Sequence, residues 1–191
     1  MGRVVKYLFL SVAVALVWAP AEARADGYVS PFAGITFGAG AVTNGRGAYG
    51  ADAGWMGGGI IGGEVDLGYL PHFFGDQGTL GTNYIVDLMG NVIVGIPVGG
   101  QHGAGIRPYG TIGFGLMRSS IAGSRALLAI SNNDPGINAG AGVMGYFNDH
   151  VGLRGDVRYF RDVHNNGGVN QLNIDFGGLH FWRASIGLVL R

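Results

Sequence analysis

The stretch GLRGDVRYF, residues 152–160, alternates charged and apolar side chains at every second position. Its charged residues are Arg154, Asp156 and Arg158, and the positions between them carry Leu153, Gly155, Val157 and Tyr159. Because side chains at positions i and i+2 of a strand point to the same face, the segment has one charged and one apolar face. A soluble sheet buries the apolar face, whereas a membrane barrel turns that face to lipid and encloses the charges.

The first 25 residues predict a secretory signal peptide. Arg3 and Lys6 precede the apolar run 7–18, and the small-residue segment 19–25 ends in an A-x-A pattern, so we expect cleavage at its end. The apolar run is shorter than the about 20 residues that a membrane-spanning helix needs. Residues 26–191 then form a single barrel domain, and strands must make any membrane crossing.

The composition excludes several classes of protein. Glycine supplies 39 of the 191 residues, yet 48% of the chain is apolar and only 13% is charged, which is the wrong balance for a solvated coil. We therefore expect the glycines to lie in ordered structure. The formal net charge is zero, so nucleic acid is not an expected partner. The chain has no cysteine, which excludes disulfides, thiolate metal sites and a lipid-modified cysteine.

Eight segments repeat the alternation of the opening stretch. They are residues 27–38, 48–55, 61–69, 83–94, 107–118, 137–147, 152–160 and 182–190. Each has about the length that a tilted membrane strand needs. The pattern predicts an all-β fold, an eight-stranded antiparallel up-and-down transmembrane β-barrel.

The connections between these segments alternate in length. We expect short turns at 57–59 and 148–150, a moderate one at 96–106, and four long loops at 39–47, 71–80, 119–133 and from 162 to about 171. Short periplasmic turns and long external loops are typical of outer-membrane barrels, which places both termini in the periplasm. The apolar run 126–130 in the third long loop is open to three interpretations: it packs on the barrel mouth, extends a strand, or contacts a partner.

Charged residues of both signs fall on the predicted inner face. The acids are Asp52, Glu64, Asp66, Asp87 and Asp156, and the bases are Arg107, Arg154, Arg158 and Arg183. The interior of an eight-stranded barrel is just wide enough for side chains to fill it, so we expect these groups to pair in a structural network. Inward glycines would make room for the arginines. Aromatic belts at the two membrane interfaces are predicted for Tyr49, Trp55, Tyr69, Tyr84, Tyr159 and Trp182.

Four stretches carry a resemblance to a known family: GYVSPFAGITFG (27–38), RPYGTIGFGL (107–116), SNNDPGINAGAGVMGYFNDHVGLRGDVRYFR (131–161) and FWRASIGLVL (181–190). Together with the leader they resemble the small OmpA-type outer-membrane β-barrel domain family. The resemblance implies a location in the bacterial outer membrane after export through the periplasm. It also implies contact with outer-membrane lipid and lipopolysaccharide, insertion by the barrel-assembly machinery, and an unknown surface ligand for the loops. Such proteins usually end on an aromatic residue, and this sequence ends on Arg191.

The sequence predicts no catalytic residue, cofactor or metal site, and favours a structural or surface-interaction role. Two G-x-G-x-x-G matches, at 57–62 and 140–145, are expected by chance in so glycine-rich a chain. A lipid A-modifying enzyme is an alternative, with His164 or His180 as the base and Ser119, Ser120 or Ser131 as the hydroxyl. Two further alternatives are a narrow passive pore and a soluble secreted ligand-binding barrel, and the latter needs its apolar rows inward.

Overall fold

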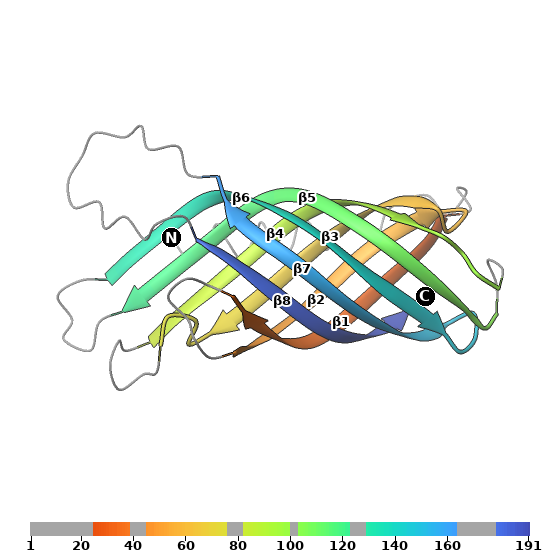
Figure 1. Ribbon diagram of the computed structural model, residues 1–191, viewed down its shortest axis with the longest axis horizontal. Coiled ribbons are helices and arrows are strands. Elements are labelled where there is room, and N and C mark those ends of the chain that lie inside the picture. Colours follow the sequence, from red (N-terminus) through yellow and green to blue (C-terminus); the bar gives the residue numbers. More distant parts are fainter. Residues whose placement is uncertain (1–24, 39–44, 76–81, 100–102, 123–128, 164–178) are drawn as a thin grey trace, which may run out of the picture.

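The computed structural model describes residues 25–38, 45–75, 82–99, 103–122, 129–163 and 179–191. It contains eight strands: β1 (Ala25–Phe37), β2 (Arg46–Gly57), β3 (Ile61–Pro71), β4 (Thr82–Gly95), β5 (Gly105–Ala122), β6 (Ala129–Tyr146), β7 (Val151–Asp162) and β8 (His180–Leu190). Every strand pairs antiparallel with its neighbour in sequence, and β1 pairs with β8, so the sheet closes on itself. Figure 1 shows the strands running obliquely around this one barrel.

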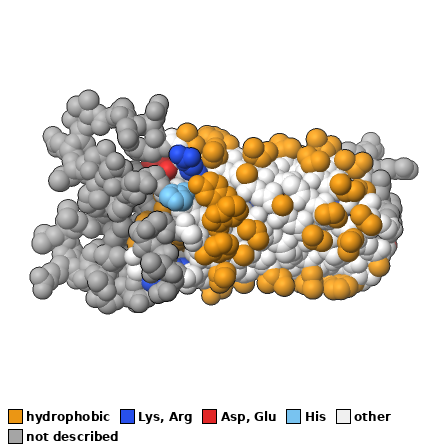
Figure 2. Space-filling view, viewed as in Figure 1, with side chains coloured by type: hydrophobic (Ala, Val, Ile, Leu, Met, Phe, Trp, Pro, Cys, Tyr) orange, Lys and Arg blue, Asp and Glu red, His pale blue; other side chains and the backbone are white. Residues whose placement is uncertain are grey.

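The two faces of the strands lie as the alternation predicts. On β7, Arg154 and Arg158 are 3% and 0% exposed, whereas Leu153 and Val157 are 43% and 42% exposed. Figure 2 shows hydrophobic side chains across the outer wall, with charged and histidine side chains only at one end of the face in view. The predicted eight-stranded transmembrane barrel is confirmed, and the soluble alternative fails because the apolar rows face outward.

The tight turn between β2 and β3 explains one run of glycines. The amide of Ile60 donates to the carbonyl of Gly57 over 3.1 Å, and the two central residues, Gly58 and Gly59, have φ angles of 58° and 71°. Positive φ at both central positions defines a type I′ turn, whose twist matches that of the flanking strands and which L side chains rarely adopt. The first G-x-G-x-x-G match is therefore a hairpin turn.

The turn between β6 and β7 is held by one asparagine. Oδ1 of Asn148 accepts hydrogen bonds from the amides of His150 (2.8 Å) and Val151 (2.9 Å). A side chain that accepts amides two and three residues ahead stabilises a turn locally. Both short turns therefore lie where the sequence predicts them.

The long hairpin of β5 and β6 corrects one predicted boundary. The sequence predicts a loop over residues 119–133, but β5 continues through Ala122 and β6 begins at Ala129, with Ser120 paired to Ser131. Strand pairing satisfies backbone groups whatever the polarity of the side chains, so the Ser and Asn residues that suggested a loop belong to strands. Of the apolar run 126–130, the last two residues extend a strand, and 126–128 lie outside the described residues.

The two predicted aromatic belts contain unequal numbers of the predicted residues. Tyr49, Tyr69, Tyr84, Tyr159 and Trp182 all lie toward the end of the barrel where β1, β3, β5 and β7 finish, and only Trp55 lies toward the opposite end. We call the first the loop end and the second the turn end. At the loop end, ring centroids of Tyr69 and Tyr84 are 5.8 Å apart, and those of Tyr159 and Trp182 are 5.1 Å apart. Amphipathic rings of this kind favour a membrane–water interface.

Among the described residues, no helix is long and apolar enough to span a membrane. The expected leader lies outside the described residues except for its last residue, Ala25, with which β1 begins.

Candidate functional site in the barrel lumen

The charged side chains of the lumen come from two opposite parts of the wall. Strands β2, β3 and β4 contribute the acids Asp52, Glu64, Asp66 and Asp87, and strands β7 and β8 contribute Arg154, Asp156, Arg158 and Arg183. All eight are buried. The antiparallel closure of the barrel turns the acidic row toward the basic row across the lumen. We call these eight side chains the charge cluster.

Two arginines of β7 share the same acids. In Arg154, Nη1 lies 2.6 Å from Glu64 Oε2, and Nη2 lies 3.1 Å from Asp156 Oδ2. In Arg158, Nη2 lies 2.8 Å from Glu64 Oε1, and Nη1 lies 2.9 Å from Asp66 Oδ2. Each oxygen of Glu64 therefore accepts from a different guanidinium group. Such charge-assisted hydrogen bonds are about twice as strong as neutral ones.

Arg183 of β8 joins the cluster from the neighbouring strand. It pairs with Asp66, and its Nη1 lies 3.4 Å from Asp87 Oδ1. Its guanidinium carbon also lies 4.5 Å from the ring centroid of Phe32 and 4.7 Å from that of Phe160. Arg183 therefore has carboxylates at its edge and aromatic rings within cation–π distance.

Neutral side chains complete the hydrogen bonding of the cluster, and the sequence analysis missed their role. The hydroxyl of Tyr28 donates to Glu64 over 2.5 Å, and that of Tyr109 donates to Asp156 over 2.9 Å and accepts from Arg154 Nε over 2.6 Å. A buried charge is tolerated only when paired and hydrogen-bonded, because desolvation costs several kcal/mol per ion. The alternating pattern of β1 and β5 places both tyrosines on the inward face, and this position could have indicated their role.

Two apolar layers flank the charge cluster along the lumen. The layer at the loop end consists of Ala48, Leu70, Phe73, Ile85, Met89, Met117, Phe160 and Phe181. The layer at the turn end consists of Tyr28, Met56, Ile93, Tyr109, Met144, Tyr146 and Val189. In the first layer the rings of Phe160 and Phe181 stack at 5.0 Å with an interplanar angle of 9°. The sequence analysis assigned the inner face to charges and glycines, and did not recognise these layers.

Arg107 lies outside the charge cluster, in the adjoining apolar layer at the turn end. Its Nη1 is 3.7 Å from Met56 Sδ, and its guanidinium carbon is 5.3 Å from the ring centroid of Tyr146. It is buried as the inner-face assignment predicts, but it packs in the apolar layer of that end. The structure therefore gathers eight of the nine predicted lumen charges into one cluster and places the ninth beside it.

Inward glycines make room for the arginines. A Cβ at Gly140 would lie 2.5 Å from the carbonyl oxygen of Val157 and 2.7 Å from Cγ of Arg158, and one at Gly68 would meet the carboxylate of Asp87 and lie 2.7 Å from Nη1 of Arg183. Real Cβ atoms essentially never come this close to another atom, so the arginines, together with the Val157 carbonyl and the Asp87 carboxylate, occupy the space that side chains at these positions would need. The second G-x-G-x-x-G match, which includes Gly140, therefore lies inside β6 and opens no helix.

The sequence matches the family described as Outer membrane protein beta-barrel domain over residues 8–181. This chain belongs to that outer-membrane β-barrel family. The crystal structure of Neisserial surface protein A superposes with a TM-score of 0.64 and 16% identity, covering 86% of this chain and 96% of that one. At this identity the likeness shows the barrel fold alone.

Two further solved structures resemble this outer-membrane barrel less closely. The N-terminal β-barrel domain of Pseudomonas aeruginosa OprF gives a TM-score of 0.49 at 18% identity, covering 87% of this chain and 98% of that one. Ail, the attachment invasion locus protein of Yersinia pestis, gives 0.48 at 10% identity, covering 86% and 97%. No match was found among curated proteins.

The candidate catalytic residues of the outer-membrane barrel do not converge in the part of the chain that the structure describes. Ser119 and Ser120 lie on β5 and His180 on β8, and three strand spacings of about 4.8 Å each separate these two strands. His164 and the side chain of Ser131 lie outside the described residues. The described residues also contain no group of three His, Cys, Asp or Glu side chains able to hold a metal ion.

Proposed function

We propose that this outer-membrane barrel is a closed anchor that displays its long connections at the cell surface for interaction, without transport or catalysis. The observation that carries the proposal is the filled lumen. A charge cluster lies between two apolar layers, and all of these side chains are buried. An interior occupied in this way leaves the surface connections and the outer wall as the parts available to partners.

The filled lumen argues against the alternative of a passive pore. Eight strands enclose an interior just wide enough for side chains, and water-filled channels belong to barrels of 16 or more strands. Arg158 and Phe160 would both have to move out of the lumen before a solute could pass, and each is 0% exposed.

The separation of the candidate catalytic residues argues against a lipid A-modifying enzyme. A nucleophilic mechanism needs a hydroxyl and a base within hydrogen-bond reach. The carboxylates of the lumen cannot supply an acid to an outward-facing histidine, because Asp156 and its neighbours are engaged with arginines on the other side of the wall.

The partners that fit this role are those of a membrane-anchored surface protein. The apolar outer wall fits outer-membrane lipid and lipopolysaccharide, and barrel-assembly machinery would insert the chain after export and removal of the leader. The ligand of the loops is a further component outside the cell. The barrel fold and the family membership support this choice of partners.

Cysteine labelling tests the orientation, because the chain has no cysteine of its own. Val163→Cys lies just beyond β7 at the loop end, and Ile60→Cys lies in the β2–β3 turn at the opposite end. We expect a bulky maleimide reagent to label Val163→Cys on intact cells and to label Ile60→Cys only after the outer membrane is permeabilised. The reverse pattern would contradict the proposal.

Solute flux tests the closed lumen. Liposomes that contain the purified barrel should not swell faster in small sugars than protein-free liposomes, whereas a general porin run in parallel should accelerate swelling. Sugar flux through the purified barrel at rates near those of the porin would establish a channel and overturn the proposed closed anchor.

A further inference from the structure

A hollow lies on the outer wall of the barrel where β6, β7 and β8 adjoin. Its volume is about 540 Å³ and its lining is almost entirely apolar: Ala139, Gly140, Ala141, Val157, Tyr159 and Trp182. The register explains its shape, because Ala139 pairs with Tyr159 and Tyr159 pairs with Trp182. Two alanines form the floor and two large rings form a wall, so the hollow is a groove in a surface that faces lipid. We call it the β6–β8 groove.

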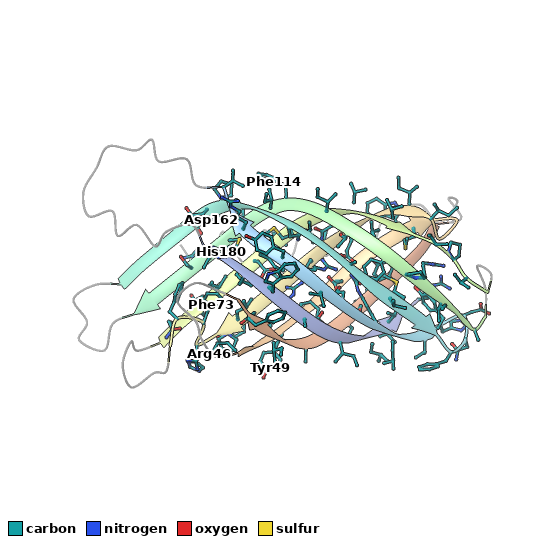
Figure 3. All side chains as sticks on the ribbon, viewed as in Figure 1. Arg46, Tyr49, Phe73, Phe114, Asp162 and His180 are labelled. Carbon is teal, nitrogen blue, oxygen red and sulfur yellow. The ribbon has the colours of Figure 1, made fainter. Side chains whose placement is uncertain are left out.

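A basic rim, formed by Arg161 and His180, lies directly beyond this groove at the loop end. Arg161 pairs in register with Ile137 on one side and with His180 on the other. Arg161 is exposed and belongs to the outward row of Val157 and Tyr159. Figure 3 shows His180 and Asp162 at this end of the barrel, where β7 finishes and β8 starts.

Asp162, the acidic residue next to this rim, forms a hydrogen bond with the backbone of Leu179. Oδ2 of Asp162 accepts the amide of Leu179 over 2.9 Å. On β7, Asp162 falls on the inward face with Arg158 and Phe160, whereas Arg161 falls on the outward face. The ring of His180 lies 6.4 Å from that of Tyr159, so this part of the rim adjoins the groove.

The spacing of groove and rim suits a phosphorylated lipid. A strand rises about 3.3 Å per residue, so the Cα atoms of Arg161 and Tyr159 lie roughly 7 Å apart along β7. A guanidinium group binds phosphate oxygens in a bidentate manner, and an apolar hollow accepts an acyl chain. A lipid with its phosphate at the rim and one acyl chain in the groove would satisfy both features.

We propose that the β6–β8 groove and its rim bind lipid A of lipopolysaccharide, with one acyl chain over Ala139 and Ala141 and a phosphate at Arg161 and His180. The choice of lipid A rests on the proposed orientation, because the loop end then lies in the outer leaflet where lipopolysaccharide resides. Charge complementarity favours this occupant over a second copy of the chain, because the outward rows of the described strands carry apolar side chains and no Asp or Glu.

Binding of defined lipids to the detergent-extracted barrel tests the proposal. Native mass spectrometry would count the lipid A molecules bound, with phosphatidylglycerol as the second lipid. Ala141→Phe fills the groove, and its matched control Ala53→Phe places the same ring on the lipid-facing row of β2. Arg161→Gln removes the rim charge, and its control Arg118→Gln removes an arginine from the outward row of β5. Heat-modifiable gel mobility first confirms that every variant is folded.

We expect lipid A to bind the wild-type barrel one to one, and both site variants to bind it about tenfold or more weakly, while both controls bind as the wild type does. Equal binding in all variants would mean that the groove contacts only ordinary boundary lipid and is not a specific site. Equal affinity for phosphatidylglycerol would overturn the choice of lipid A, and a dimer abolished by Ala141→Phe would make the groove a protein interface. Because binding is measured in detergent, a failed orientation in the labelling experiment is distinguishable from a failed lipid site.

Discussion

Arg158 on β7 and Arg183 on β8 lie directly opposite each other in the barrel wall, and both donate to Oδ2 of Asp66 on β3. Asp66 itself lies directly opposite Asp52 on β2. Like charges in directly opposed positions of a sheet are destabilising, so each of these strand pairs carries a local electrostatic penalty. Closure of the barrel relieves both penalties at once, because it brings the two rows together across the lumen.

This arrangement couples parts of the chain that are far apart in sequence. The contact from Arg158 to Asp66 spans 92 residues and that from Arg183 spans 117. Neither row is compensated until strands near both ends of the chain are in place, so the charge cluster favours the complete barrel over partly closed sheets. Contacts of such separation also slow folding, since loop closure precedes the gain.

Loss of the central arginine should destabilise the barrel strongly. Arg158→Leu removes one of the two arginine partners of both Glu64 and Asp66 in a buried site, and breaking buried pairs in this way costs about 3–5 kcal/mol. The measurement is the urea midpoint of the refolded barrel in lipid vesicles, followed by heat-modifiable mobility. Arg118→Leu, on the outward row of β5, is the matched control and should change the midpoint little. Equal midpoints for both variants would mean that the cluster contributes nothing to stability.

Removal of one acidic charge should be far milder. The charge cluster contains five acids and three arginines, so it carries two formal negative charges in excess. Asp87 lies at its edge, with its Oδ1 at 3.4 Å from Arg183. Asp87→Asn keeps the shape and lowers the excess, so we expect a change within about 1 kcal/mol in the same unfolding assay, in either direction. A loss as large as that of Arg158→Leu would contradict this charge count.

The strand number, the two faces and the lumen charges could be predicted from the sequence because period-two alternation is a local property. Arg154, Asp156 and Arg158 show their common face within five residues of chain. Their partners could not be assigned, because the pairing of Arg158 with Asp66 depends on how far each strand is displaced relative to the next, and the sequence pattern does not state that displacement. The stacked pair Phe160 and Phe181 was missed for a related reason. Where an inward residue is apolar, the inward and outward faces of the strand have the same polarity, and the alternating pattern disappears.

The ends of strands were predicted less well than their centres. Residues 119–122 and 129–133 belong to β5 and β6 although their composition resembles that of a loop. Beyond the lipid, a strand no longer needs an apolar outer row, so the alternation that marks it in the membrane disappears while the backbone pairing continues. Sequence patterning therefore marks the part of a strand that the membrane covers, and underestimates the hairpin that projects from it.

The inward glycines should show a position-specific sensitivity to a single methyl group. A Cβ at Gly140 would lie 2.5 Å from the backbone oxygen of Val157, 2.7 Å from Arg158 Cγ and 2.9 Å from Arg158 Cα, so Gly140→Ala should cost about 1–3 kcal/mol. A Cβ at Gly155, on the outward row of β7, would meet only a carbonyl oxygen at 3.9 Å. Gly155→Ala should therefore be neutral or slightly stabilising. Urea midpoints of the two variants decide the matter, and a larger loss at Gly155 would show that the inner and outer rows are exchanged.

Charge on the outer wall should be costly according to its depth in the bilayer. Ile186 lies midway along β8 and is 63% exposed on the lipid-facing side, whereas Phe147 lies at the β6–β7 turn with the same exposed fraction. Ile186→Arg should therefore lower the free energy of unfolding by about 2–4 kcal/mol, and Phe147→Arg by about 0–1 kcal/mol. Vesicle-based unfolding of both variants measures the difference. If the two substitutions cost the same, the hydrocarbon core is not centred on the middle of β8, and the membrane must lie nearer one end of the barrel.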